Sequence, residues 1–462
     1  MWNRKFDKSD RKKFLHLVEY IIELIDSGEL APGQALPTQR ELSRRLGVSI
    51  GTITKAFNEL EKMGYLSGEI GRGTFVKDIS SDFSQFWFTE SKVPYEYNLG
   101  HYRTTELFNH SIQLNLLGSI REVANDSLLF GHLHDLNNLG SGDLKMAFAG
   151  WIRSLGFSAL SENEITVLSS DIFSVNVLVN AFTQPGDTIL MEEIGDRISR
   201  DQTEKAGRVV ETVKMDEKGI DPNDLKAAIK KCQPKILLTN PTFHNPTSNT
   251  TALKRKQEIS EVCAAHGVLI VEDGKVDMFH EGEVYPYYTI NPDNAIYNTG
   301  LYFHINPSLT TSVVVAKPDV LKQVEEVYTL NYWNGSQLLH QIALNLIESG
   351  RAGTIITEKK KMLKERNLLV NEIMGVHSES STSVLRWLAI PYGKSSAELT
   401  QMAYENGILV RNSDIFSLNK AQASPPYIRI CNGATHETDQ FTSALKLLKE
   451  LFENQSAEVK VR

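Results

Sequence analysis

Three short apolar runs in the middle of the chain alternate with segments of helical periodicity, and this alternation constrains the fold more than any other feature. The runs cover residues 188–191, 235–239 and 268–271, and helices are predicted between them at residues 201–206 and 253–265. Strands that are apolar on both faces are typical of a parallel sheet with helices on both sides. We therefore predict an α/β domain built on a mostly parallel sheet.

The N-terminal part of the chain follows a different pattern. Apolar residues recur at three- and four-residue steps over residues 11–27, which predicts a helix. A second helix is expected between Thr38, a good N-cap residue, and Gly47, which suits the left-handed conformation that ends a helix. A third helix is expected over residues 49–63, and a short β-hairpin follows within residues 65–76.

Two of these helices are joined by a tight turn at residues 46–49, which matches the helix-turn-helix motif of DNA-binding proteins. The start of the later helix is expected at base edges in the major groove, and the arginines of the earlier helix beside phosphates. The tip of the hairpin is expected in an adjacent minor groove, as a wing. The residues that we predict to bind duplex DNA are Arg40, Arg44, Ser49, Ile50, Thr52, Thr54, Lys55, Arg72, Gly73 and Thr74.

The nearly continuous string LPTQRELSRRLGVSIGTITKAFNELEKMGYLSGEIGRGTFV, residues 36–76, resembles the GntR family of bacterial regulators. The resemblance implies that Arg40 and Thr52 contact DNA and that Arg72 belongs to the wing tip. One position departs from the family, because the residue after the turn serine is usually arginine there and is Ile50 here. An isoleucine can contact a thymine methyl group, where the arginine would have contacted guanine.

Four landmarks follow in order in the remainder of the chain. They are Pro185-Gly186-Asp187, Asn240-Pro241-Thr242-Phe243-His244-Asn245-Pro246-Thr247, Val271-Glu272-Asp273 and Tyr427-Ile428-Arg429-Ile430. Together they resemble the fold-type I, class I and II aminotransferases over about residues 99–455, and such a domain behind a GntR-like domain resembles the MocR subfamily of regulators. The resemblance implies a winged helix-turn-helix domain at residues 1–78, a linker at 79–98, and a smaller C-terminal α+β subdomain at about 330–455.

The resemblance also implies roles for three residues of this second domain. In the family, an aspartate pairs with the pyridine nitrogen of pyridoxal phosphate, and Asp273 matches it. An asparagine binds the ring hydroxyl, and Asn245 matches it. An arginine near the C-terminus holds the substrate carboxylate, and Arg429 matches it. Arginine suits that task because its guanidinium forms a charge-assisted, bidentate pair with a carboxylate.

The rest of the cofactor apparatus of the family is missing. The segment with the Schiff-base lysine, roughly Y-x-G-T-F-S-K-x-L-x-P-x-x-R, aligns with residues 297–310, where Phe303 takes the place of the lysine. No lysine occurs between Lys275 and Lys317, so this absence does not depend on one alignment. The positions of the phosphate-binding arginine, the phosphate cup and the ring-stacking aromatic are held by Thr310, Asp171 and Asp196. We therefore predict no transamination, no tight binding of pyridoxal phosphate and no other cofactor.

Three functions remain open for the second domain. Lys275 can supply a surrogate amine, which would give a pyridoxal-phosphate-dependent aminotransferase or a regulator that senses this cofactor. A ligand with a carboxylate for Arg429, such as a small carboxylate or an amino acid, would give a sensor. A domain without any ligand would serve dimerisation alone. We predict the sensor, in a homodimeric regulator that binds a two-half-site operator and whose ligand pocket contains Asn245, Asp273, Lys275, Phe303 and Arg429.

The scattered cysteines and the lack of an apolar signal-peptide core favour a cytoplasmic protein. The net charge is −8, and we find no run of about 18 uncharged apolar residues of the kind that spans a membrane. Three scattered cysteines favour reduced thiols. His132 and His134 lack a third ligand nearby, so no metal site is predicted.

Overall fold

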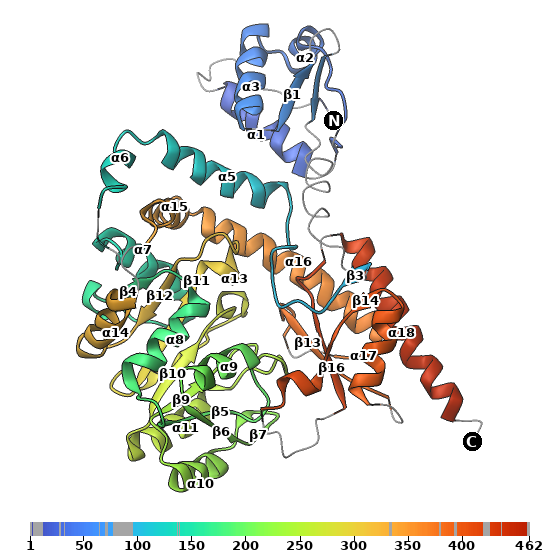
Figure 1. Cartoon of the computed structure of the whole chain (residues 1–462). Coiled ribbons are helices and arrows are strands. Elements are labelled where there is room, and N and C mark those ends of the chain that lie inside the picture. The colour runs from blue at the N-terminus through green and yellow to red at the C-terminus, as the bar shows by residue number, and fades with distance from the viewer. Residues whose placement is uncertain are drawn as a thin grey trace. The chain divides into compact units, whose positions relative to one another are not determined.

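The computed structural model divides into two compact units (Figure 1). The first comprises residues 1–93 and 109–118, and the second residues 94–108 and 119–462. The structure describes residues 2, 13–26, 29–31, 33–63, 65–69, 73–76, 96–135, 137, 139–331, 335–377, 380–391, 395–418, 426–435 and 437–459, apart from the side chains of residues 69, 171, 172 and 454–459. Arg72 of the predicted wing tip, the side chain of Asp171 and most of the predicted linker therefore lie outside the described residues.

The first unit has the predicted winged helix-turn-helix fold. Its elements are α1 (Lys13–Asp26), α2 (Gln39–Leu46), α3 (Ile50–Met63) and the antiparallel strands β1 (Leu66–Glu69) and β2 (Gly73–Val76). Both predicted ends of α2 are confirmed, because Thr38 Oγ1 accepts a hydrogen bond from the backbone N of Glu41 at 3.3 Å and Gly47 has a φ of 68°. The apolar faces of the helices meet in one core, which includes Leu17, Ile21, Leu42, Ile53, Phe57 and Leu60.

The second unit is built on a seven-stranded sheet, and the prediction of a mostly parallel sheet is confirmed. In the strand order β4-β12-β11-β10-β9-β5-β6, only β12 runs antiparallel to its neighbours. The strands are β4 (Ile165–Leu168), β5 (Thr188–Glu192), β6 (Val209–Val213), β9 (Ile236–Thr239), β10 (Leu269–Asp273), β11 (Ala295–Gly300) and β12 (Ser312–Val315). The central strands are buried on both faces, as their apolar runs predict.

Helices pack against this sheet in two groups. One group is α8 (Asp171–Phe182), α9 (Arg197–Lys205) and α14 (Pro318–Asn331), and the other is α10 (Pro222–Cys232), α11 (Leu253–His266) and α12 (Tyr287–Ile290). The predicted helix at residues 201–206 begins earlier, at Arg197, because the side chain of Asp196 caps it by accepting from the backbone N of Ile198.

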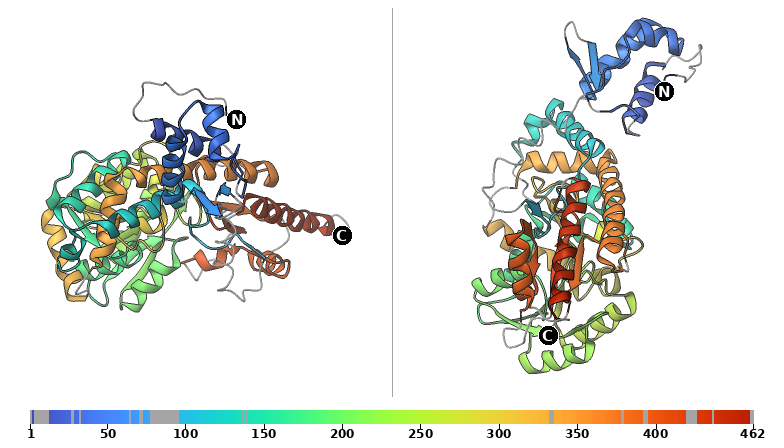
Figure 2. Two further views of the ribbon diagram at one scale, coloured as in Figure 1. Left: turned by 90° about the horizontal axis from the view of Figure 1, so that it is seen from above. Right: turned by 90° about the vertical axis from the view of Figure 1, so that its right-hand side faces the viewer.

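A smaller α+β subdomain follows the large sheet, and its orange and red elements gather together in both views of Figure 2. Its antiparallel sheet has the strand order β13-β16-β15, and a separate strand, β14, pairs in parallel with β3. The elements are β13 (Leu385–Ala389), β14 (Ile408–Leu409), β15 (Arg411–Asn412), β16 (Tyr427–Cys431), β3 (Tyr97–Asn98), α16 (Arg351–Met374), α17 (Ser396–Glu405) and α18 (Thr438–Val459). The pairing of β3 with β14 brings the first residues of the second unit against this subdomain.

The remaining elements complete the two units. They are α5 (His110–Asn125), α6 (Leu129–His132), α7 (Gly142–Ile152), α13 (Leu301–His304), α15 (Gln337–Glu348) and the hairpin of β7 (Met215–Asp216) and β8 (Gly219–Ile220). Among the described residues, the helices are all too short or too polar to cross a lipid bilayer.

Candidate functional site

The candidate DNA interface of the first unit centres on the start of α3. Ser49 caps this helix, because its Oγ accepts a hydrogen bond from the backbone N of Thr52 at 3.1 Å and lies 2.8 Å from Thr52 Oγ1. Ile50 follows with 46% of its surface exposed, and Lys55 is exposed one turn later. The predicted recognition residues therefore lie at the surface of the unit, and Ile50 is free to make an apolar contact.

Thr54 has a contact that holds the motif together. Its Oγ1 donates a hydrogen bond to Gln39 Oε1 at 2.7 Å, and this bond joins α3 to α2. The relative position of α2 and α3 decides which side chains of the motif reach base edges and which contact phosphates. The DNA contact predicted for Thr54 itself stays a prediction.

Cationic side chains are exposed beside this surface. Arg40 and Arg44 of α2 are exposed and form no ion pair with a described acidic residue, whereas Arg45 is paired with Glu41 at 2.5 Å. Arg40 and Arg44 are thus available for phosphates.

The described part of the wing contains Gly73 and Thr74. Gly73 has a φ of 119°, and the carbonyl of Thr74 accepts a hydrogen bond from the backbone N of Leu36.

In the second unit, the buried residues Asp273 and Lys275 at the end of β10 form a charged cluster with the half-buried Asp196 at the start of α9. Lys275 Nζ lies 2.6 Å from Asp273 Oδ2 and 2.9 Å from Asp196 Oδ2. Asp273 is 4% exposed and Lys275 is 7% exposed. Burial by itself would lower the pKa of Lys275, but the two carboxylates raise that pKa well above its ordinary value. Lys275 is therefore an ammonium ion at neutral pH.

The pKa values of the two carboxylates of this cluster shift in opposite directions. Burial raises the pKa of Asp273, and Lys275 opposes that effect. For Asp196, burial also acts to raise the pKa, but the contacts with Lys275 outweigh it and the pKa is lowered. Sequence reasoning placed Asp196 where the family has a stacking aromatic, and its pairing with Lys275 was missed because 79 residues separate the two.

Arg429 lies buried beside Asn245. Its Nη1 donates a hydrogen bond to Asn245 Oδ1 at 2.9 Å, and its Nη2 donates to the carbonyl of Gly100. The guanidinium carbon lies 4.9 Å from the ring centre of Phe416 and 5.7 Å from that of Tyr102. Burial lowers the pKa of Arg429 to about 10, so the side chain stays charged at neutral pH.

Asn240 joins the two parts of the site. Its Nδ2 donates to the backbone carbonyl of Asp273 at 2.7 Å, and its Oδ1 accepts from the backbone N of Asn245 at 3.1 Å. The residue belongs to the landmark at 240–247, but the sequence alone gave no reason to distinguish it, because both of its partners are set by the tertiary structure.

Phe303 lies on α13, immediately after β11, and is 6% exposed. Its ring centre is 4.9 Å from that of Tyr102, which also contacts Arg429. The aromatic side chain therefore borders the same site from which the lysine of the family is missing.

A second buried amine lies near Phe303. Lys359 of α16 donates hydrogen bonds to Thr104 Oγ1 at 3.2 Å and to the carbonyl of Ile305 at 2.8 Å, and Thr104 in turn donates to the carbonyl of Phe303. Burial lowers the pKa of Lys359 to about 7. Sequence reasoning did not find this residue, because only the tertiary structure brings α16 to α13.

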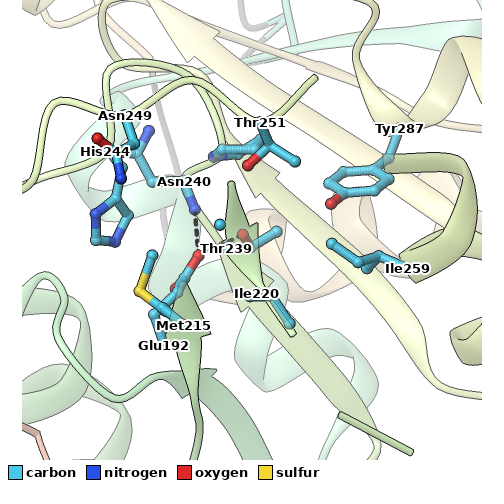
Figure 3. A pocket seen from close by; sticks show the side chains of 12 residues that line it. Glu192, Met215, Ile220, Thr239, Asn240, His244, Asn249, Thr251, Ile259 and Tyr287 are labelled. Atoms are coloured by element: carbon cyan, nitrogen blue, oxygen red, sulfur yellow. Dashed lines mark hydrogen bonds between the residues drawn. The ribbon is translucent and has the colours of Figure 1, made fainter. Parts of the chain in front are cut away.

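A further pocket, which Asn240 also lines, lies at the ends of β5 and β9 (Figure 3). Its lining includes Glu192, His244 and Tyr287, and Glu192 Oε1 accepts hydrogen bonds from Thr239 Oγ1 and from the backbone N of Asn240. Burial raises the pKa of Glu192 to about 7. The empty space of about 250 Å³ is smaller than most ligand pockets. The described part of the chain contains no cluster of three or more His, Cys, Asp or Glu residues that could hold a metal ion, in this pocket or outside it.

Two known protein families match different parts of the chain. Residues 14–76 match the model of the bacterial regulatory proteins of the gntR family, and residues 111–448 match the model of aminotransferase class I and II. The HTH-type transcriptional regulator YdfD of Bacillus subtilis (strain 168) is 24% identical over 456 residues, which cover 90% of this chain and 92% of that protein. YdeF of the same organism, also named an HTH-type transcriptional regulator, is 22% identical over 98% of this chain and 97% of its own length.

Solved structures resemble the second unit. An archaeal alanine:glyoxylate aminotransferase superimposes with a TM-score of 0.70 at 17% identity and covers 82% of this chain and 95% of its own. The α-aminoadipate aminotransferase LysN from Thermus thermophilus has a TM-score of 0.68 at 16% identity and covers 78% of this chain and 92% of its own. Likeness at this level of identity establishes the fold alone.

Proposed function

Because the chain belongs to the class I and II aminotransferase family and carries a gntR-family helix-turn-helix domain ahead of that fold, we propose that it is a ligand-sensing regulator that does not use pyridoxal phosphate. It is a DNA-binding transcription regulator of the GntR family fused to an aminotransferase-like domain. In our proposal, that domain binds a small carboxylate at Arg429 and controls DNA binding.

The observation that carries the proposal is the ion pair between Lys275 and Asp273. Family resemblance assigns Asp273 to the ring nitrogen of pyridoxal phosphate, yet its Oδ2 already holds the ammonium of Lys275 at 2.6 Å. Lys275 contacts only one oxygen of Asp273, so a pyridinium at Oδ1 would have to share the carboxylate with the ammonium of Lys275. Two cations at one buried carboxylate repel each other, which disfavours binding of the cofactor ring. Together with the missing Schiff-base lysine, this repulsion means that the residues present do not fit the cofactor.

Lys275 is also a poor replacement for the missing Schiff-base lysine. An amine must lose its proton before it can attack an aldehyde, and the two neighbouring carboxylates hold this one protonated. Phe303, at the aligned position of the lysine, has no amine to offer. These two features together favour a domain without imine chemistry.

The carboxylate-binding half of the site is retained. Arg429 is 4% exposed and forms no ion pair with a described acidic residue, and its Nε has no hydrogen-bond partner among the described residues. A buried guanidinium without a counter-ion is costly, and a bound carboxylate relieves that cost through charge-assisted hydrogen bonds. Asn245 already fixes the orientation of the guanidinium. A small carboxylate is therefore the ligand class that this site favours.

A ligand at Arg429 can regulate DNA binding only if it binds two states of the protein with different affinities. We propose that the chain is a homodimer whose two helix-turn-helix domains bind the two half-sites of an operator, and that the ligand changes the population of dimers with the correct spacing. Symmetric dimers commonly read palindromic sites in this way.

The absence of imine chemistry can be tested with the purified full-length chain and pyridoxal phosphate. We expect no absorbance band that survives dialysis and no mass increase after reduction with borohydride, whereas a class I/II aminotransferase treated in parallel shows both. A retained, reducible adduct would overturn the proposal. Its loss in Lys275→Ala or in Lys359→Met would then identify the amine, and Lys359 is the better candidate because its pKa of about 7 leaves part of it unprotonated.

Carboxylate binding can be tested by calorimetry and thermal shift with small mono- and dicarboxylates. We expect at least one acid to stabilise the wild-type chain and to change its affinity for operator DNA. Arg429→Gln should abolish both effects, whereas a substitution of the exposed Arg153 should not. A chain to which no carboxylate binds would contradict the sensor and favour a domain that serves dimerisation alone.

A further inference from the structure

A second arginine lies directly beside Arg429. Strand β15 pairs antiparallel with β16, and Arg411 is the residue opposite Arg429 in that register. Residues directly opposite in an antiparallel pair place their side chains on the same face of the sheet. Arg411 Nε donates to the carbonyl of Gly100 at 3.3 Å, and Arg429 Nη2 donates to the same oxygen. Two guanidinium groups therefore converge on one neutral acceptor.

This pair of cations has no carboxylate in direct contact among the described residues, and only Asp196 acts on Arg429 from farther away. Neither Arg411 nor Arg429 forms an ion pair with an acidic residue in the described part of the chain, whereas the neighbouring Arg103 pairs with Glu106 at 3.0 Å. His101 adds no further positive charge, because burial and the charges of the three arginines lower its pKa to about 4 and leave it neutral. The two guanidiniums also repel each other, and Arg411 adds to the effect of burial in lowering the pKa of Arg429.

One carbonyl dipole cannot balance two positive charges, and a ligand with two negative charges can. Since both donor nitrogens bond to the same oxygen, they lie within about 6 Å of each other. Arg411 is half-buried and Arg429 is buried, so the two present an inner and an outer position for anionic groups. A carboxylate that reaches Arg429 therefore extends toward Arg411.

From this arrangement we propose that the ligand is a short dicarboxylate, with one carboxylate on Arg429 and the other on Arg411. This inference rests on the proposed carboxylate sensor and names its ligand class. Each charge-assisted contact of this kind is worth about 1.5–3 kcal/mol, which corresponds to roughly a tenfold to hundredfold change in affinity. The second carboxylate is thus the source of selectivity against monocarboxylic acids of the same length.

The matched probes are succinate and butyrate, two four-carbon acids that differ in the second carboxylate, with L-aspartate as a third arm that adds an amino group. Calorimetry with the wild-type chain should show succinate or L-aspartate binding on the order of tenfold to a hundredfold more tightly than butyrate. In Arg411→Gln, the affinity for the diacid should fall to that for butyrate, and the affinity for butyrate should stay unchanged. Arg411→Lys, which keeps the charge, should retain part of the preference and guards against a simple folding defect.

The outcomes separate the two proposals. Arg429→Gln should weaken binding of both acids, and Arg153→Gln should leave both unchanged. If succinate and butyrate bind the wild-type chain equally, or if Arg411→Gln keeps the full preference for the diacid, the dicarboxylate inference is wrong while the carboxylate sensor stands. If no acid binds the wild-type chain, the sensor and the inference both fail.

Discussion

Lys275 Nζ lies 2.6 Å from Asp273 Oδ2, so the acid that family resemblance assigns to a cofactor is paired with an amine of the same chain. Asp196 completes the contact from the other side at 2.9 Å. In this chain the ammonium of Lys275 takes the place that the pyridinium of a bound cofactor has in the family. This exchange explains how an aminotransferase-like fold can keep a buried aspartate at the end of β10 without needing a cofactor to neutralise it.

The internal ion pair should stabilise the folded state strongly against removal of its cation. We expect Lys275→Met to lower the free energy of unfolding by about 3–5 kcal/mol, because the buried carboxylate of Asp273 and the half-buried carboxylate of Asp196 would both lose their cation. Urea unfolding followed by circular dichroism measures the change. Asp196→Asn should recover part of the loss in the Lys275→Met background.

The matched control for that variant is Lys317→Met, which removes an exposed ion pair with Asp293. Exposed pairs contribute about 0–1 kcal/mol, so this variant should stay close to wild type. Equal unfolding free energies for the two variants would show that the cluster around Lys275 stabilises the fold no more than an exposed ion pair does.

Glu192 predicts a pH dependence on the acid side of neutrality. Burial raises its pKa from 4.5 to about 7, so between these values the folded state holds a proton that the unfolded state has lost. Its contribution to stability is complete below pH 4.5 and is lost as the pH rises to about 7, at up to about 1.4 kcal/mol per pH unit. Glu192→Gln keeps an oxygen for Thr239 and Asn240, and its unfolding free energy should lack this decline. A wild-type curve parallel to that of the variant would refute the shift.

Lys359 predicts the opposite slope at alkaline pH. Burial lowers its pKa from 10.5 to about 7, so the unfolded state binds a proton there that the folded state does not. Its contribution to stability is complete above pH 10.5 and is lost as the pH falls toward 7. Replacing the side chain in Lys359→Met should therefore flatten the rise in unfolding free energy between pH 7 and pH 10, measured by urea titration at each pH. An unchanged slope would mean that the amine is charged in the fold.

Arg40 should contribute to DNA binding through phosphate. We expect Arg40→Ala to weaken binding to all duplexes to a similar extent and to reduce the log–log salt slope by about 0.9. Fluorescence anisotropy at several salt concentrations gives both numbers. Arg45→Ala is the comparison, and because Arg45 is already paired with Glu41, its effect should be smaller. Equal effects from the two variants would contradict the assignment of Arg40.

Much of the fold could be predicted from local patterns. The ends of α2 follow from Thr38 and Gly47, because capping depends on residues within a few positions of each other. The parallel sheet follows from apolar runs such as 268–271, because a strand buried on both faces leaves no polar alternation. The start predicted for α9 is four residues too late, because its first turn has no apolar periodicity and is fixed by the N-cap Asp196.

Short segments of the sequence were enough to predict the helices of the helix-turn-helix, the central parallel strands and the missing lysine, because helix caps, apolar periodicity and residue identity are local properties. The contacts that surround Asp273 and Arg429 depend instead on how distant segments pack together. Asn245 meets Arg429 across 184 residues, and Arg411 lies beside Arg429 because two strands of the small sheet pair in that register. Strand order and register set such contacts, and neither can be read from the spacing of residues along the chain.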